Sequence, residues 1–184
     1  NYKTDPDLWY VLGIIESGKI RVYYDDQEVL DIDAIFGRQG EETPTGEYEI
    51  VLNLAGPDAT LMEHLGTTVA DAVDGSLTFA NFVEFDSLYG HRRDISGYAR
   101  HLEWFDAAIA PILAALRPDD LMIFTADHGN DPSWTGTDHT RERVPVLAAG
   151  PYSGQVGVRG FVDVAASVAH HLGLDARGAG ESFL

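Results

Sequence analysis

The sequence predicts an α/β fold with a mainly parallel sheet, and three features carry that prediction. From about Leu61 onward, helical spacing of apolar residues alternates with short apolar strands, a pattern typical of parallel α/β sheets. Polar residues directly follow two of these strands, as they do at the ligand-binding edge of such sheets. Apolar residues make up 45% of the 184, which suits a soluble domain with its own core. We expect a single α/β domain over residues 1–184, with a turn- and strand-rich part at 1–60 and the core at 61–184.

The first sixty residues predict one short helix and three strands. Asp5-Pro6 is a favourable helix start and Gly18 a favourable helix end. β-branched and aromatic residues separated by turn residues then indicate the strands. The strands are expected at Lys19–Tyr24, Glu28–Ile32 and Tyr48–Leu54.

The remaining elements follow from apolar spacing and from capping residues. Leu61, Leu65, Val69 and Val73 recur at helical spacing, and Gly75 ends that helix. Asp94 caps a long amphipathic helix that runs to Leu116. We expect strands at Leu77–Phe85, which should be largely buried, and at Leu121–Ala126 and Val144–Ala149, with a closing helix at Phe161–Leu172.

Charge and composition exclude several classes of partner. Thirty acidic residues against twelve Lys and Arg give a formal charge of −18, which repels nucleic acid and anionic lipid surfaces. The longest apolar run, Ala107–Leu116, is far shorter than the roughly 20 residues of a membrane-spanning helix. No cysteine is present, so any metal must be held by oxygen and imidazole nitrogen. We expect a cytoplasmic protein that binds neither nucleic acid nor membranes.

Polar clusters at the ends of predicted strands are the candidate site. Asp86 and His91 follow the first of these strands, Asp127 and His128 follow the second, and His139 lies in the next loop. Ligands of open parallel sheets bind beyond the carboxyl ends of the strands, so we expect these side chains to meet in one crevice. Carboxylate and imidazole together suit Mn²⁺, Zn²⁺ or Fe²⁺, and Mg²⁺ where histidines are fewer.

Each cluster also has an ordinary structural interpretation. An Asp-His pair after a strand is often a helix cap beside a surface histidine, and Asp and His five residues apart occur by chance. Arg92 and Arg93 could simply flank a helix start, although arginine there opposes the helix dipole and so favours a functional reason. His101, His170 and His171 lie on predicted helices, and we interpret them as structural or surface residues. The metal interpretation depends on the clusters occurring together.

Three strings of residues resemble the phosphopentomutase family of the alkaline phosphatase superfamily. They are Thr125-Ala-Asp-His-Gly-Asn130, Thr137-Asp-His-Thr-Arg141 and Tyr89-Gly-His-Arg-Arg-Asp94. The four-residue interval between Asp86 and His91 separates this pattern from the related cofactor-independent phosphoglycerate mutases. The match is dense from about residue 77 to 184, and it implies an alkaline-phosphatase-like three-layer α/β/α fold truncated at the N-terminus.

The resemblance also implies a function and a set of ligands. The family interconverts ribose or deoxyribose 1-phosphate and 5-phosphate, a sugar-phosphate isomerisation at two Mn²⁺ ions. Asp86, His91 and His139 would hold one ion completely, and Asp127 and His128 would supply part of the second site. The family's nucleophilic threonine has no counterpart that we find, so the catalytic residue is unknown.

Two other functions stay open on these residues. A diverged or truncated relative that lacks the nucleophile would act as a metal-binding module. A phosphohydrolase would use a metal-bound water in place of threonine. The sequence does not indicate an oligomeric state.

Overall fold

The computed structural model describes residues 19–24, 27–31, 49–53, 57–174 and 178–184. The chain forms two compact units, Asn1–Leu61 and Met62–Leu184. The boundary lies next to the division at residues 60 and 61 that the sequence predicts. The helix expected from Asp5 to Gly18 lies outside the described residues.

The first unit contains a three-stranded sheet. Its strands are β1 (Lys19–Tyr24), β2 (Gln27–Asp31) and β3 (Glu49–Asn53), each within one residue of the expected bounds. The strand order is β2-β1-β3, with β2 antiparallel and β3 parallel to β1. The register of β1 against β2 shifts by one residue between Val22 and Tyr23.

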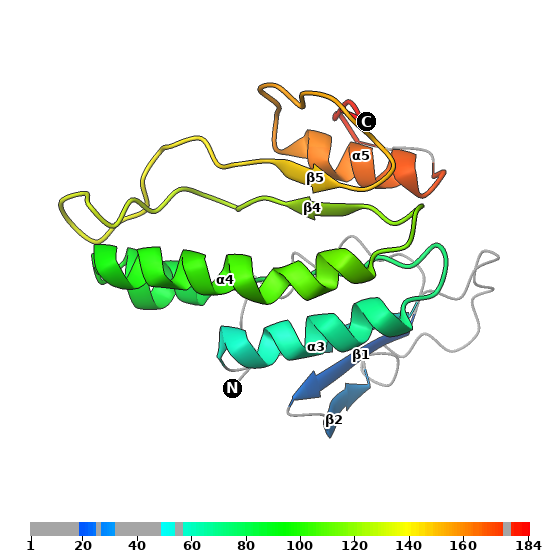
Figure 1. The fold of residues 1–184 in the computed structure, drawn as a ribbon, viewed down its shortest axis with the longest axis horizontal. Coiled ribbons are helices and arrows are strands. Elements are labelled where there is room, and N and C mark those ends of the chain that lie inside the picture. The colour runs from blue at the N-terminus through cyan, green and yellow to red at the C-terminus, as the bar shows by residue number, and fades with distance from the viewer. Residues whose placement is uncertain (1–18, 25–26, 32–48, 54–56, 175–177) are drawn as a thin grey trace. The chain divides into compact units, whose positions relative to one another are not determined.

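Three helices are the longest elements of the described part of the second unit (Figure 1). Helix α3 (Asp58–Asp71) begins at the end of the first unit, α4 spans Ile95–Ala115, and α5 spans Val162–His171. All three were predicted to within a few residues. Asp94 caps α4 as expected, because its side chain accepts a hydrogen bond of 2.8 Å from the backbone N–H of Gly97. Among the described residues, none of the helices has the length and apolar character that crossing a membrane requires.

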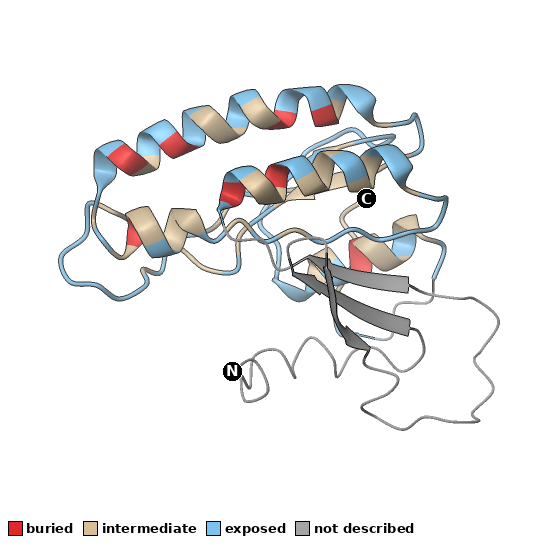
Figure 2. Cartoon of the chain, turned by 90° about the horizontal axis from the view of Figure 1, so that it is seen from below, coloured by how far each residue is buried: buried red, intermediate tan, exposed pale blue. Residues whose placement is uncertain are grey.

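The core of this unit lies between α3 and α4. Met62 packs with Ile109 and Ile112, and partly buried apolar residues surround these three. A Cβ on Gly66 would lie 3.7 Å from Ile112 Cδ1, so the two helices approach closely at that point. Figure 2 shows the buried positions of α4 spaced along one side of the helix, as its apolar stripe predicts.

The strands of the second unit differ from the prediction. Strands β4 (Met122–Phe124) and β5 (Leu147–Ala149) are shorter than expected, and they pair antiparallel. The expectation of parallel neighbours is therefore wrong for this pair. In Figure 1, β4 and β5 run between α4 and α5. The α/β class holds, because helices cover a sheet whose polar strand ends carry the candidate site.

The strand expected at Leu77–Phe85 is also wrong. This segment pairs with no strand among the described residues, and Leu77 and Phe79 are 66% and 84% exposed. The reason lies in two aromatic residues within the segment. Phe82 and Phe85 are three residues apart, and both pack edge-on against Phe105 of α4, at ring-centroid distances of 5.0 and 5.8 Å. That spacing fits a helical turn rather than the alternation of a strand.

Candidate metal centre

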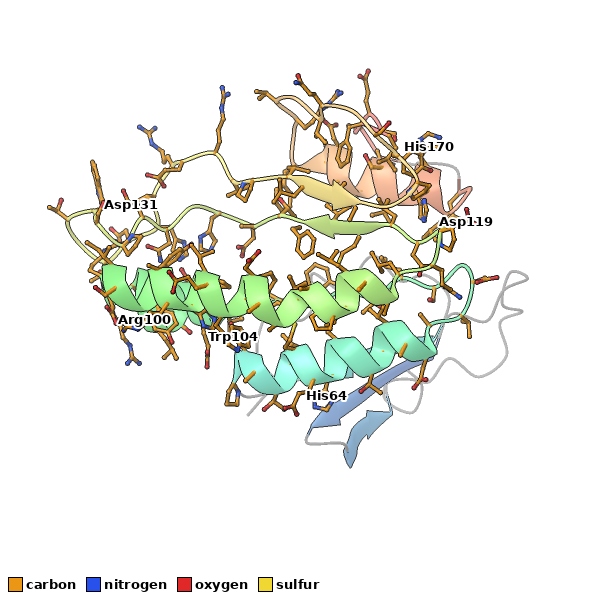
Figure 3. All side chains as sticks on the ribbon, in the orientation of Figure 1. His64, Arg100, Trp104, Asp119, Asp131 and His170 are labelled. Atoms are coloured by element: carbon orange, nitrogen blue, oxygen red, sulfur yellow. The ribbon has the colours of Figure 1, made fainter. Side chains whose placement is uncertain are left out.

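Two segments of the second unit build the site. One is η2, a π-helix at Phe85–Gly90, together with the turn that joins it to α4. The other is the excursion between β4 and β5, which carries the candidate ligands from Asp127 to His139. Figure 3 labels Asp131 of this excursion close to the end of α4 that follows η2. The five predicted ligands therefore come from segments that meet at one end of the unit.

The π-helix explains the interval between Asp86 and His91. The backbone N–H of His91 donates to the carbonyl of Asp86 at 2.9 Å, an i→i+5 bond. Such a bond places residue i+5 one turn above residue i, so the two side chains share a face. In an ordinary α-helix the same interval would separate them by about 140°. His91 Nε2 consequently lies 3.2 Å from Asp86 Oδ2.

The antiparallel pairing of β4 and β5 brings the other ligands into place. In an antiparallel pair, the residues after one strand lie at the same edge as the residues before its partner. An isolated bridge between Gly129 and Thr140 continues this pairing, with Thr140 N–H donating to Gly129 C=O at 3.0 Å. His128 and His139 each precede a bridge residue, and their rings stack on the same side of this pairing. We predicted that these side chains would meet, but at the ends of parallel strands. The antiparallel pairing of β4 and β5 is what brings them together.

Three side chains form a tight triangle. His139 Nε2 lies 3.1 Å from His91 Nε2 and 3.4 Å from Asp86 Oδ1, and His91 Nε2 lies 3.2 Å from the other carboxylate oxygen, Asp86 Oδ2. Ligand atoms that each lie about 2.1 Å from one ion are separated by about 3.0–3.4 Å at octahedral or tetrahedral angles. The spacing of these three groups therefore fits a single divalent cation.

The hydrogen bond on the other ring nitrogen of His91 supports the same fit. His91 Nδ1 contacts the backbone carbonyl of Thr137. A carbonyl only accepts, so in a neutral imidazole Nδ1 carries the proton and Nε2 presents its lone pair. That lone pair faces the carboxylate of Asp86 and the ring nitrogen of His139. A carboxylate and two imidazole nitrogens that converge in this way can together hold a divalent metal ion, so the donor set itself fits one.

His128 borders this triangle, and Asp127 is more distant from it. The ring of His128 stacks on that of His139, with centroids 3.6 Å apart. A ring nitrogen of each histidine and a carboxylate oxygen of Asp86 all lie within 4.8 Å of one another. The Asp127 side chain is 69% exposed, and its Oδ2 lies 3.6 Å from His128 Nε2. All five predicted residues thus gather at one place, with Asp127 on its rim.

An aromatic cluster on α4 supports η2 from beneath. His101 is buried, stacks on Trp104 at 4.8 Å, and lies 4.4 Å from the ring of Phe85. This position agrees with the structural interpretation of His101. Burial raises the pKa of Tyr98, and the nearby charge of Asp86 raises it further. The Tyr98 hydroxyl is consequently protonated beside the site at neutral pH.

Sequence reasoning assigned no role in the site to two residues of this region, Arg93 and Asn130. Asn130 Nδ2 donates to Asp86 Oδ1 at 2.6 Å, and Arg93 bonds to the ligand-bearing excursion. The position of Arg93 at a helix start was the one signal, because a cation there opposes the helix dipole. Asn130 stands in the recognised string but carries no signal that distinguishes it from a turn residue.

Residues 32–176 match the family described as the metalloenzyme superfamily. The chain belongs to the metalloenzyme superfamily. That match covers most of the chain, and it confirms the predicted α/β class and a divalent metal cofactor. The resemblance found in the motif strings is confirmed as well, because curated relatives named phosphopentomutase match at 51–59% identity.

Three of these relatives define the extent of the similarity. A phosphopentomutase of Rhizobium leguminosarum bv. trifolii is 53% identical over 133 residues, which are 71% of this chain and 33% of the relative. One of Methylobacterium sp. (strain 4-46) is 59% identical over 71% of this chain and 32% of its own length. One of Shewanella baltica (strain OS155) is 55% identical over 69% and 31%. This superfamily member therefore spans about a third of the length of the relatives that it matches.

Proposed function

We propose that this chain carries out phosphopentomutase-type isomerisation at its metal centre, moving a phosphoryl group between the 1- and 5-positions of ribose or deoxyribose. The observation that carries the proposal is the triangle of Asp86, His91 and His139, with 3.1–3.4 Å between ligand atoms. Identity of 51–59% to phosphopentomutases supports the substrate class, a small sugar phosphate.

The proposal includes two Mn²⁺ ions. Asp86, His91 and His139 would hold the first, and Asp127 with His128 would contribute to the second. The donor set supports a first-row transition metal, because it mixes imidazole with carboxylate and contains no thiolate. Two divalent ions held there would supply positive charge that binds phosphoryl oxygens and neutralises the charge developing on them. The stacking of His128 on His139 is compatible with two adjacent sites.

The chain's own residues would orient these ligands. Thr137 holds the tautomer of His91 through its carbonyl, and Asn130 holds the carboxylate of Asp86. The exposed carboxylate of Asp127 is open to a ligand on the rim. The proposal also includes the mainly parallel three-layer α/β/α sheet of the alkaline phosphatase superfamily, one domain for residues 1–184, and a cytoplasmic location, which the lack of cysteine supports.

A ³¹P NMR assay of the purified chain tests the function. With Mn²⁺ and glucose 1,6-bisphosphate present, ribose 5-phosphate should convert to ribose 1-phosphate, and a chelator should stop the conversion. His139→Ala should abolish it, because the triangle loses one corner. His170→Ala is the matched control, since His170 lies on α5 and bonds to Ser182 instead.

Two results would contradict the proposal and separate its rivals. Release of inorganic phosphate from a generic phosphomonoester, without isomerisation, would identify a metal-dependent phosphohydrolase. Inactivity combined with tight binding of one ion per chain, measured by isothermal titration calorimetry, would identify a metal-binding module.

A further inference from the structure

Arg93 joins the two segments that carry the metal ligands. Its guanidinium donates to five acceptors, four of them on the excursion between β4 and β5 and one in its own turn, and the two N–H groups of Nη1 are shared among three of these acceptors. The acceptors are Gly136 O at 2.5 Å, Asn130 Oδ1 at 2.6 Å, Asp131 O and Asp138 O at 2.7 Å, and Gly90 O at 3.1 Å. All five acceptors are neutral oxygens.

The backbone of Arg93 is strained, which indicates that these bonds determine its conformation. Its φ is +56°, the one positive value at a non-glycine among the described residues. A side chain with a Cβ rarely adopts this left-handed region, and it persists only where the surroundings impose it. The turn lies between η2 and α4, so the strain is located next to the proposed site.

Each ligand of the triangle is connected to Arg93 through one intermediate residue, either by hydrogen bonds or by its neighbouring position in the chain. Asn130 accepts from Arg93 with its oxygen, so its amide nitrogen is directed at Asp86, to which it donates at 2.6 Å. The Thr137 carbonyl that contacts His91 lies between two carbonyls that Arg93 binds, those of Gly136 and Asp138.

His139 is the third ligand, and its chain position follows from the same bonds. It is the residue after Asp138, whose carbonyl accepts from Arg93 at 2.7 Å. The fork of one guanidinium therefore fixes one carboxylate, one tautomer and one backbone position together. A lysine could not do this, because a single ammonium cannot reach acceptors spread over this loop in a planar arrangement.

We infer that Arg93 is a positioning residue that assembles the ligand triangle before the metal binds. The inference deepens the proposed function and rests on its metal site. This role can be distinguished from a simple effect of the Arg93 charge on metal affinity. The guanidinium is a permanent cation close to the ion, so by charge alone its removal would tighten metal binding. Positioning predicts weaker binding whether the charge is kept or lost.

The test measures Mn²⁺ affinity of the full chain by isothermal titration calorimetry. Arg93→Lys, which keeps the charge, and Arg93→Gln, which removes it, should both weaken binding about 10- to 100-fold, the range measured for residues that orient metal ligands. Asn130→Ala should weaken it less, because it removes only the link to Asp86. Arg100→Ala, at an exposed position of α4, is the matched control and should bind as the unaltered chain does.

A second measurement uses the metal-free protein. Long-range ¹H–¹⁵N spectra should show His91 as the Nδ1–H tautomer in the unaltered chain and as a mixture of tautomers in Arg93→Lys. Circular dichroism should show both folded at the temperature of measurement.

The outcomes separate this inference from the proposed function. Unchanged or tighter Mn²⁺ binding in both Arg93 variants would overturn the inference, as would a His91 tautomer that the lysine variant leaves intact. Absence of Mn²⁺ binding in the unaltered chain would overturn both. Weakened binding in the Arg93 variants of a chain that shows no isomerase activity would support the inference and contradict the proposed reaction.

Discussion

The two ends of α4 are each closed by an arginine, and the two arginines work differently. Arg93 precedes the helix and donates only to neutral oxygens. Arg117 follows the helix and pairs with carboxylates, at 2.8 Å from Asp120 and 2.9 Å from Asp74. The Asp74 side chain is 98% exposed. Arg93 organises a loop that lies some forty residues further along the chain. Arg117 mainly closes the turn to Asp120, three residues away.

The difference shows which arginine affects chemistry. Exposed ion pairs contribute little, because water screens both charges and two long side chains must be ordered. A guanidinium that donates to several carbonyls of one loop fixes where the residues of that loop lie. The Arg93 end of α4 should therefore control metal binding, and the Arg117 end should affect only local stability.

The largest effect is expected from Gly90→Ala, which disturbs the Arg93 end without altering the arginine. A Cβ there would lie 2.6 Å from Asn130 Nδ2 and 3.0 Å from the Phe85 carbonyl. Asn130 must then move away from Asp86. We expect a loss of about 1–3 kcal/mol of stability from overpacking and an Mn²⁺ affinity lowered about 10-fold or more, measured by urea unfolding and calorimetry.

Gly66→Ala is the matched control for that substitution. Its Cβ would make ordinary contacts at 3.7 Å with Ile112, and alanine is about 0.5–1 kcal/mol better than glycine inside a helix. We expect it to stabilise the protein and leave metal binding unchanged. Equal behaviour of the two alanine variants would contradict the close packing at Gly90.

A smaller effect is expected from Asp94→Ala. It removes the 2.8 Å bond to Gly97 N–H, which caps α4 next to the strained turn. The loss should be about 1 kcal/mol of unfolding free energy, and Asp94→Asn should recover most of it because asparagine caps equally well. An asparagine variant as unstable as the alanine one would show that charge, rather than capping, matters there.

Asp163, like Arg93, is a charged side chain that bonds to backbone groups. Substituting it should have a smaller effect than the changes above. Backbone N–H bonds from Glu181, first, and Gly160 lower the pKa of this carboxyl. A lowered pKa in the folded state adds stability above the unfolded pKa of about 3.9, and this stability is lost as the pH falls through the folded value.

Asp163→Asn should therefore lower the melting temperature at pH 7 and do so progressively less toward pH 3. Asp106→Asn, at an exposed position of α4, controls for the loss of one charge. A melting difference that stays constant across this pH range would contradict the role of the ionised carboxylate.

The smallest effect is expected from Arg117→Ala. The arginine and Asp120 hold each other at the surface, which raises the pKa of Arg117 and lowers that of Asp120. The change in melting temperature should be slight at low salt and vanish at about 1 M salt, where the screening length is about 3 Å. Metal affinity should not change. Any loss of Mn²⁺ binding in this variant would remove the contrast between the two ends of α4.

Regular elements and ligand identities were the predictable part of this molecule. Helices α4 and α5 follow from apolar spacing and the Asp94 cap, which are local properties. Asp86, Asp127 and His128 could be found because they directly follow apolar segments, and His91 and His139 because they lie in the loops that come next. Their gathering at one place agrees with the prediction, and their role as metal ligands stays a prediction.

Pairing and local winding were not predictable from the same signals. The direction of β5 against β4 depends on the path of the excursion between them, which no periodicity encodes. Segment 77–85 has strand-forming composition, but packing of Phe82 and Phe85 on α4 overrides that local preference. The role of Arg93 depends on carbonyls some forty residues away, and the sequence does not show that these come close.

The π-helix at Phe85–Gly90 changes how spacing should be interpreted in sequences of this kind. Searches for ligand pairs on helices favour residues three or four apart, because those share a face of an α-helix. Here a hydrogen bond across five residues places Asp86 and His91 on one face, so an interval that can arise by chance in a sequence has a structural cause. The same bond makes the interval intolerant of length change. Loss of one residue between Asp86 and His91 would allow a regular α-helical turn but would remove the match to Asn130 and His139.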